Sequence, residues 1–192
     1  MPSSDEVSKA DRILDGAAEL FATKPYHEVR LEDIAARAQV GKGTVYLYWV
    51  SKEDVYLAVI RRGFALVSDR LERELPGCAN TWDAIRATVA AIVDFAFAHP
   101  GVYRIMRSGQ LTPEDPELQR IRRGLADRIE RTLRAGVEAR ELSDPSPPLT
   151  TQYMLSFVRG AVLYPPEGMT AESLTDHMMH VLRNGIGTGA RA

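Results

Sequence analysis

Two adjoining segments decide the fold of this chain: LEDIAARAQV at residues 31–40 and GKGTVYLYW at residues 41–49. The first segment repeats apolar side chains at the spacing of one helix face, namely Leu31, Ile34, Ala35 and Ala38. The second segment has room for about two helical turns, because Ser51 then supplies a fresh N-cap for the next helix. The two segments therefore predict a pair of short helices that join near Val40 and Gly41, the pattern of a helix-turn-helix.

The composition of these two helices suits contact with another molecule. Ala35 allows the helices to approach closely, and Ile34 and Val45 supply the contact between them. Glycine at 41 and 43 lets the backbone come near another surface. The side chains of the second helix that we expect to be exposed can bond phosphates or base edges, and they are Lys42, Thr44, Leu47 and Tyr48. From the spacing alone, an ordinary helical corner with a solvated lysine is an equally good interpretation.

The rest of the chain is predicted to be helical as well. Its 192 residues, 45% of them hydrophobic, are enough to bury a core, and no alternating pattern or hairpin turn predicts a strand. The helix expected at residues 81–98 is apolar on two sides, which is typical of the central helix of a bundle. Further helices are expected at about residues 8–24, 52–75, 102–107, 116–140, 149–164 and 170–184. The predicted fold class is therefore all-α.

The distribution of charge narrows the classes of partner. A formal net charge of -2 gives no overall attraction to nucleic acid. Residues 37–52 nevertheless carry Arg37, Lys42 and Lys52 and no carboxylate. Binding to nucleic acid therefore has to rest on this local excess of positive charge.

Cysteine content and hydropathy indicate a cytoplasmic protein. Cys78 is the single cysteine and forms no internal disulfide, which favours a reducing compartment. The first residues show no apolar core of a signal peptide. Residues 145–166 are weakly charged, but their continuous apolar part is shorter than the roughly 20 residues that a bilayer requires. We expect a buried helix there and no membrane segment.

The helix-turn-helix resembles the N-terminal DNA-binding domain of TetR-family transcriptional regulators. The residues that carry the resemblance are LEDIA at 31–35, GKGTVYLYW at 41–49 and SKED at 51–54, and the similar region spans about residues 10–60. The resemblance implies a three-helix DNA-binding domain at residues 1–52 and a helical-bundle domain for effector binding and dimerisation at residues 53–192. It also implies a homodimer on palindromic double-stranded operator DNA, most simply a repressor that a small apolar or amphipathic effector releases.

The same resemblance assigns roles to individual residues. Lys42, Gly43 and Thr44 begin the recognition helix, and Tyr46 bears on the phosphate backbone. Leu47 and Tyr48 face the bases, and Lys52 holds a phosphate at the start of the following helix. Arg30, before the first helix of the motif, departs from the family pattern, and we expect it to add a phosphate contact instead of a cap.

Three residues depart from the family pattern, and a fourth is a conservative exchange. Gln39 stands where a turn glycine is usual, and Gly41 replaces the usual hydroxyl cap of the recognition helix. We expect these two departures to loosen the turn by under about a kilocalorie per mole. Arg30 replaces the usual hydroxyl cap of the first helix of the motif. Trp49 replaces the common phenylalanine and is interpreted as a core anchor, with base stacking as the lesser alternative.

Candidate effector contacts lie in the C-terminal part. Residues 99–106, HPGVYRIM, resemble the junction before the short helix that borders the effector cavity in this family. Large, adaptable side chains are candidate pocket walls or, alternatively, packed core: Phe95, Tyr103, Met106, Met154 and Phe157. Arg159 is the one charge on an otherwise apolar helix, so it pairs, reaches an edge, or contacts an anionic ligand.

The last two predicted helices carry more apolar surface than one core needs. Leu149, Tyr153, Phe157 and Ala161 form one stripe, and Met154, Val158 and Val162 form another. A partner face on the final helix is offered by Leu174, Met178, Val181 and Leu182. We therefore expect dimerisation through a four-helix interface.

No pattern in the sequence predicts catalysis, a cofactor or a metal site. Asp176, His177 and His180 lie on adjacent turns but lack a further ligand nearby in the sequence. Nucleophile elbows, phosphate loops and Cys-His pairs are absent from the sequence. Two alternatives remain open: a helical small-molecule-binding or catalytic protein without specific DNA binding, and a DNA-binding regulator without an effector.

Overall fold

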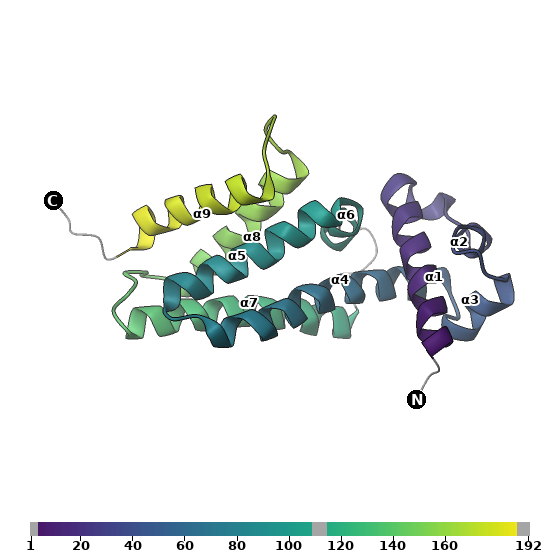
Figure 1. Cartoon of the computed structure of the whole chain (residues 1–192), viewed down its shortest axis with the longest axis horizontal. Helices are drawn as coiled ribbons and strands as arrows, with labels where there is room; N and C mark the ends of the chain where they lie inside the picture. The colour runs from purple at the N-terminus through teal and green to yellow at the C-terminus, as the bar shows by residue number, and fades with distance from the viewer. Residues whose placement is uncertain (1–3, 109–114, 188–192) are drawn as a thin grey trace. The chain divides into compact units, whose positions relative to one another are not determined.

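The computed structural model describes residues 4–108 and 115–187, and these residues are almost entirely helical (Figure 1). The longer helices are α1 (Ser4–Thr23), α4 (Lys52–Glu74), α5 (Thr81–Ala98), α7 (Pro116–Glu138), α8 (Pro147–Leu163) and α9 (Ala171–Ile186). The shorter ones are α2 (Leu31–Arg37), α3 (Lys42–Tyr48), α6 (Pro100–Ser108) and the 3-10 turns η1 (Tyr26–Glu28) and η2 (Leu75–Gly77). Within the described ranges, the β interaction is limited to an isolated bridge between Leu142 and Gly187. The all-α prediction is confirmed.

Helix ends differ from the predicted ones where the capping residue lies elsewhere. The first helix begins at Ser4, four residues before the start predicted from Ser8. The cap of α5 is Asn80, whose side-chain oxygen accepts a hydrogen bond from the Asp83 amide at 2.9 Å, so that Thr81 is the first residue of the helix. The Ser51 cap of α4 is confirmed, since the Asp54 amide donates to the Ser51 hydroxyl at 3.1 Å.

The chain forms two compact units. One takes its described residues from Met1–Phe64 and Gly101–Pro113, and the other takes them from Ala65–Pro100 and Glu114–Ala192. The division falls inside α4, so the helix contributes residues to both units. Most of α6 belongs to the N-terminal unit although it follows α5 in the sequence.

In the N-terminal unit, α2 packs against both α1 and α3. Ile13, Ile34 and Val45 have no exposed surface, as the predicted contact between the two helices of the motif requires. A cluster of aromatic rings formed by Phe21, Tyr26 and Tyr56 joins α1, η1 and α4, with centroids 5.0–5.7 Å apart. These contacts fix the orientation of the helix-turn-helix within its unit.

In the C-terminal unit, α5 is the central helix and packs against α7, α8 and α9 (Figure 1). Ile85, Val89 and Ile92 are buried on one of its sides, and Ala91 and Phe95 are buried on another. The prediction of a central helix that is apolar on two sides is therefore confirmed. No single helix in the described ranges is long and apolar enough to cross a membrane; α5 and the start of α6 pass that test only as a bent pair.

Candidate DNA-binding surface and C-terminal hollow

The turn between α2 and α3 places a non-glycine residue in the left-handed backbone region. Gln39 has φ 56°, and the Val40 amide donates to the Ala35 carbonyl at 3.0 Å. This is the position where the resemblance predicts a glycine. Gln39 therefore replaces glycine at a position whose left-handed backbone conformation favours glycine.

Helix α3 presents large side chains to solvent. Leu47 is 83% exposed, Tyr46 46% and Tyr48 36%, whereas Val45 is fully buried against α2. Exposed large apolar side chains close together are typical of a contact surface. The structure thus leaves Tyr46, Leu47 and Tyr48, three successive residues of α3, exposed to solvent.

The start of α3 is equally accessible. Gly41 is the N-cap and offers no side-chain hydrogen bond, as expected from the departure at this position. Lys42 and Gly43 are exposed, and no atom lies within 4 Å of a Cβ built on Gly43. Thr44 is half-buried. A flat partner can therefore come close to the backbone at Gly43.

Two neighbours of the motif were interpreted differently or missed. Trp49, expected as a core anchor, is only half-buried, and its ring centroid lies 5.5 Å from that of Tyr48. Val50 is 84% exposed beside it and was not singled out from the sequence. Its place could have been found in the sequence, because Val50 is an apolar residue between the second helix of the motif and the N-cap Ser51.

The basic residues of segment 37–52 all have partners within their own unit. A side-chain hydrogen bond joins Arg37 to Glu19 at 2.5 Å, and the Lys42 ammonium lies 2.5 Å from a carboxylate oxygen of Glu32. The segment contains no carboxylate in sequence, but α1 and α2 supply these two in space. The local positive charge predicted from the sequence is therefore partly neutralised in this structure.

Lys52 also has a partner. Its ammonium donates to the Tyr26 carbonyl at 2.8 Å and lies 4.2 Å from the centroid of the Tyr26 ring. Both interactions tie the start of α4 to η1. Because an ammonium has three donors, a phosphate contact by Lys52 stays a prediction.

Hydrogen bonding and burial change three pKa values in this unit. The hydrogen bond from Lys42 lowers the pKa of Glu32, and the same bond raises the pKa of Lys42. Burial raises the pKa of the Tyr26 hydroxyl, and the Glu53 carboxylate adds to the effect. The Glu32–Lys42 pair is thus ionised at neutral pH.

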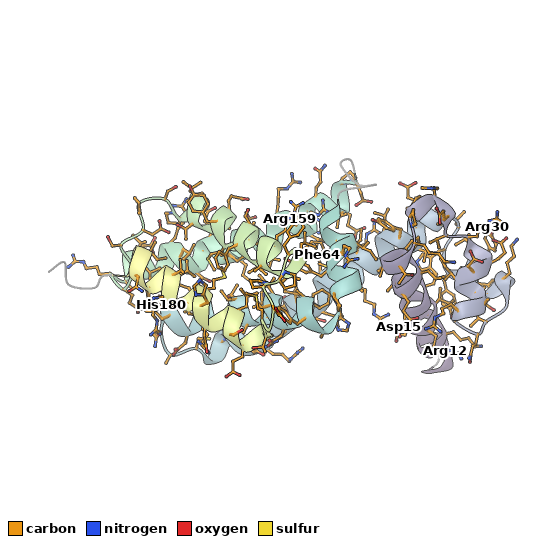
Figure 2. All side chains as sticks on the ribbon, turned by 90° about the horizontal axis from the view of Figure 1, so that it is seen from above. Arg12, Asp15, Arg30, Phe64, Arg159 and His180 are labelled. Carbon is orange, nitrogen blue, oxygen red and sulfur yellow. The ribbon has the colours of Figure 1, made fainter. Side chains whose placement is uncertain are left out.

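Arg30 begins α2 without capping it through its side chain. Its backbone N–H donates to the Asp33 carboxylate at 3.2 Å, while a guanidinium has no acceptor to return the bond. The side chain is exposed at the start of α2 (Figure 2). The structure therefore leaves the guanidinium accessible to an anion.

The six residues predicted to contact an effector do not gather in one open site. Phe95 and Met154 are buried in the C-terminal unit, and Tyr103 and Met106 are buried in the N-terminal unit. Phe157 is half-buried, with its ring 6.1 Å from that of His177. Arg159 is exposed on α8 (Figure 2), so the alternative of an edge position matches where it lies.

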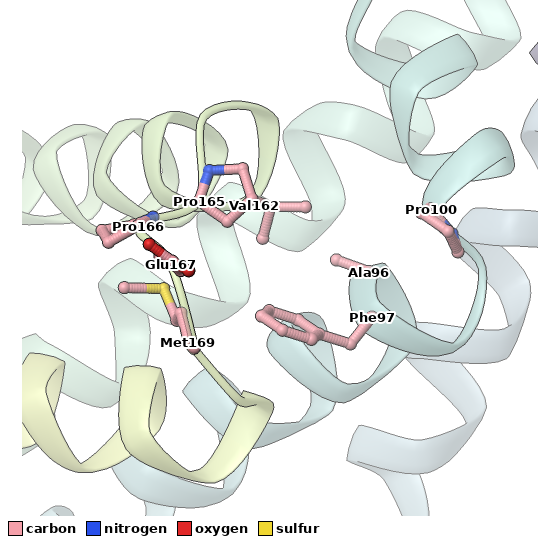
Figure 3. Close-up of a pocket in the computed structure, with 9 residues that line it drawn as sticks. Ala96, Phe97, Pro100, Val162, Pro165, Pro166, Glu167 and Met169 are labelled. Carbon is pink, nitrogen blue, oxygen red and sulfur yellow. The ribbon is translucent and has the colours of Figure 1, made fainter.

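A hollow of about 420 Å³ lies elsewhere in the C-terminal unit (Figure 3). It is formed by the end of α5, the end of α8 and the loop before α9. The Phe97 ring extends from α5 into the region opposite Val162 and Met169 (Figure 3). The full lining is Ala96, Phe97, Pro100, Val162, Pro165, Pro166, Glu167, Gly168 and Met169. None of the six predicted residues is among these, because the sequence pattern pointed to large side chains within helices and to the charge of Arg159, and not to helix ends and the Pro165-Pro166 turn.

The predicted dimer stripes divide between core and surface. Met154, Val158, Leu174 and Met178 are buried within the unit, where they complete the packing around α5. They are therefore unavailable to a partner, so the apolar surface left over on α8 is the other stripe, and the four-helix interface stays a prediction. Large apolar side chains remain exposed on α8 and α9 at Leu149, Tyr153 and Val181, and at Tyr164 just after α8.

The residues considered for metal binding form no ligand set. Asp176 is paired with Arg86 at 2.5 Å, and His180 Nε2 lies 3.0 Å from the Asn184 amide. In residues 4–108 and 115–187 no group of three His, Cys, Asp or Glu side chains is arranged to hold a metal ion.

Two family models match the chain. Residues 13–59 match bacterial regulatory proteins of the tetR family, and residues 78–186 match the tetracyclin repressor-like C-terminal domain. The second match alone spans more than half of the chain.

Three bacterial proteins are similar to the chain over between 41% and 75% of its length. The fatty acid metabolism regulator protein of Bacillus subtilis is 28% identical over 79 residues, 41% of each chain. The transcriptional activator FasR of Mycolicibacterium smegmatis is 30% identical over 95 residues, 50% of this chain and 43% of that one. The nucleoid occlusion factor SlmA of Photobacterium profundum is 26% identical over 145 residues, 75% of this chain and 74% of that one. For the first two, the match spans less than half of the relative.

Solved structures share the fold over nearly the whole chain. A regulatory protein of the tetR family from Rhodococcus superposes with TM-score 0.84 at 21% identity, covering 98% of this chain and 100% of that one. FadR of Bacillus subtilis in complex with stearoyl-CoA gives 0.80 at 19% identity, covering 94% and 99%. AibR in complex with isovaleryl coenzyme A and operator DNA gives 0.79 at 20% identity, covering 91% and 97%.

Proposed function

Because the chain belongs to the TetR family of bacterial regulatory proteins, we propose that it is a cytoplasmic transcriptional regulator that binds operator DNA as a homodimer and responds to a small molecule. We assign DNA binding to residues 1–52 and effector binding and dimerisation to residues 53–192. The observation that carries the proposal is the exposed row Tyr46, Leu47 and Tyr48 on α3, which the buried Val45 holds against α2.

Each residue of this surface has a proposed role. Leu47 and Tyr48 contact base edges in the major groove, where apolar groups and hydroxyls discriminate base pairs. Tyr46, Lys42 and Thr44 contact the phosphate backbone, and Gly43 allows the groove wall to come close. Arg30 and Lys52 add phosphate contacts on either side of the motif, which position the protein without reading sequence.

The hollow in the C-terminal unit is the proposed effector site, replacing the buried residues that sequence reasoning favoured. Its volume lies within the roughly 300–1,000 Å³ of small-molecule sites, and Phe97, Val162 and Met169 give it an apolar lining. We propose an amphipathic effector with an acyl chain. A fatty acid metabolism regulator among the relatives and stearoyl-CoA in a protein of the same fold support this class.

Fluorescence anisotropy tests the DNA-binding proposal. The full chain is titrated onto a labelled duplex from the region upstream of its own coding sequence and onto a scrambled duplex of equal length and composition. We expect at least a thousandfold preference for the first, the low end of specific recognition. Equal affinities for both duplexes contradict the proposal.

A second candidate is a DNA-binding family member that takes no effector. The observation that favours it is the match to a relative named for nucleoid occlusion rather than for metabolism. This match covers 74% of that relative, whereas the matches to the other two relatives cover 41% and 43% of theirs. Stearoyl-CoA, with free coenzyme A as control, distinguishes the two candidates. Release of the upstream duplex by the acyl compound supports the regulator, and retention across a panel of acyl chain lengths favours the second candidate.

A further inference from the structure

Glu32 connects the two helices of the motif through an ion pair. Glu32 belongs to α2, and one of its carboxylate oxygens lies 2.5 Å from the ammonium of Lys42, the first residue of α3. Both side chains are about half exposed, at 52% and 55%. The charge of Arg30 also acts on Glu32, and the Lys42 ammonium lies 5.8 Å from the centroid of the Tyr46 ring. A single carboxylate therefore pairs with Lys42 and lies in the field of Arg30, two residues of the proposed DNA-binding surface.

A DNA phosphate and this carboxylate offer the ammonium the same chemistry. Each is an anionic oxygen acceptor for a charge-assisted hydrogen bond. When Lys42 turns to a phosphate, the Glu32 carboxylate either loses its partner or stays close to a second anion. Both outcomes reduce the free energy gained from the phosphate contact.

Among the three cations of segment 37–52, this opposition is particular to Lys42. Arg37 pairs with Glu19, but Arg37 has no proposed DNA role. Lys52 donates to a neutral carbonyl, which does not repel phosphate as a carboxylate does. In the part of the chain that the structure describes, Lys42 alone of these three combines a proposed phosphate contact with a carboxylate partner.

We propose that Glu32 is an intramolecular competitor of DNA phosphate, which holds Lys42 in the free protein and limits the sequence-independent part of DNA affinity. The inference rests on the proposed DNA-binding function. Glu32 acts through Lys42 and touches no base, so it is an affinity-determining residue for specific and random DNA alike. A regulator with lower electrostatic affinity is easier for an effector to release.

The salt dependence of binding to a random duplex tests this inference. Each phosphate contact contributes about -0.9 to the slope of log K against log salt concentration. Glu32→Gln removes the competitor, so we expect that slope to become steeper by up to about 0.9 per bound half-site. The affinity should rise about twofold to fivefold per half-site at low salt, the range of an exposed ion pair.

The matched control is Glu28→Gln, which makes the same change of charge in the same unit. Glu28 is 58% exposed and its ion pair is with His27, at 3.8 Å, rather than with a lysine or arginine. The proposal expects its slope to equal that of the wild type. A steepening equal to that of Glu32→Gln overturns the proposal, because net charge then explains both.

A double-mutant cycle tests the route through Lys42. In a Lys42→Gln background, Glu32→Gln should leave the slope unchanged, and an undiminished effect there overturns the proposal. Glu32→Ala, which keeps an exposed helix former, should repeat the result of Glu32→Gln, and disagreement between these two variants also overturns it.

Failure of this inference is distinguishable from failure of the proposed function. The inference predicts the salt slope on random DNA, whereas the proposed function predicts the ratio of operator to random affinity. If the wild type shows no operator preference but Glu32→Gln still steepens the salt slope, the inference is retained and the proposed function is contradicted. If the wild type prefers the operator but Glu32→Gln leaves the slope unchanged, the function is retained and the inference is contradicted.

Discussion

Gln39 holds the turn of the helix-turn-helix in a backbone region that a side chain disfavours, with φ 56°. Gln39→Gly removes that penalty, partly offset by the greater freedom of glycine in the unfolded chain. We expect the free energy of unfolding to rise by about 0.5–1 kcal/mol. Urea denaturation of the full chain measures it, with Gln39→Ala as the control because alanine keeps the Cβ. Equal stability of the two variants would contradict the interpretation.

Tyr46 and Tyr48 lie two residues apart on α3 but have different proposed roles. Tyr48→Ala should lower operator affinity with little change on a random duplex, because base contacts carry sequence preference. Tyr46→Phe should lower both affinities by a similar factor, because a phosphate contact is blind to sequence. Anisotropy on both duplexes measures the two ratios. If Tyr48→Ala lowers the affinity for both duplexes by the same factor, the assignment of Tyr48 to base edges is wrong.

At the residue scale, sequence reasoning located side chains better than their partners. The exposure of Leu47 and Tyr48 follows from the helical periodicity, and the departure at Gln39 follows from the family resemblance. Both can be seen in a short stretch of sequence. Glu32, as the partner of Lys42, was not predicted, because the pairing depends on the angle between α2 and α3 rather than on spacing. The carbonyl of Tyr26 beside Lys52 was missed for the same reason.

Gly101 marks the closest approach between α6 and α1. A Cβ at this position would collide with the Cβ of Ala22, so Gly101→Ala should separate the two helices. We expect a loss of about 1–3 kcal/mol, the usual cost of overpacking. Gly124→Ala is the control, since nothing lies within 4 Å of a Cβ at that helical position and alanine favours helix.

The midpoint of thermal or urea denaturation should therefore fall for Gly101→Ala and rise for Gly124→Ala, relative to the wild type. Adding Ala22→Gly to Gly101→Ala should restore part of the stability by removing the opposing methyl group. Destabilisation by Gly101→Ala that Ala22→Gly does nothing to relieve would place the strain elsewhere.

Helices α8 and α9 leave apolar surface exposed after their own core is complete. Tyr153 is 63% exposed, so Tyr153→Glu should cost the single unit little while burying a charge in a dimer interface. We expect light scattering to show a dimer for the wild type and a shift toward monomer for the variant. Glu172→Gln, at an exposed position in the first turn of α9, is the control. A wild type that is monomeric at micromolar concentration contradicts the proposed interface.

Element boundaries could be predicted because capping residues and prolines near the helix ends are local features of the sequence. Asp54 with Ser51, and the proline turns around α8, define their ends within a few residues. The distribution of α8 side chains between core and surface could not be predicted. Met154 and Tyr153 are both large and apolar, and only the position of α5 decides which of them is buried.

The whole molecule is proposed to couple its two sites. Coupling between ligands is reciprocal, so operator DNA must weaken effector binding by the factor with which effector weakens operator binding. Calorimetry of stearoyl-CoA, with and without the upstream duplex, should give two affinities whose ratio matches that from anisotropy. If stearoyl-CoA binds with equal affinity in both conditions, its binding is not coupled to DNA.

The central claim is that two copies of α3 read DNA sequence together. Selection of the full chain against a pool of randomised duplexes tests it most directly. Two recognition helices on one face of B-DNA lie about one helical turn apart, roughly 34–36 Å, or a multiple of it. We predict enrichment of a pseudo-palindrome with half-site centres spaced by about 10 base pairs or a multiple. Recovery of a pool without an enriched sequence, or with a single half-site only, would contradict the account.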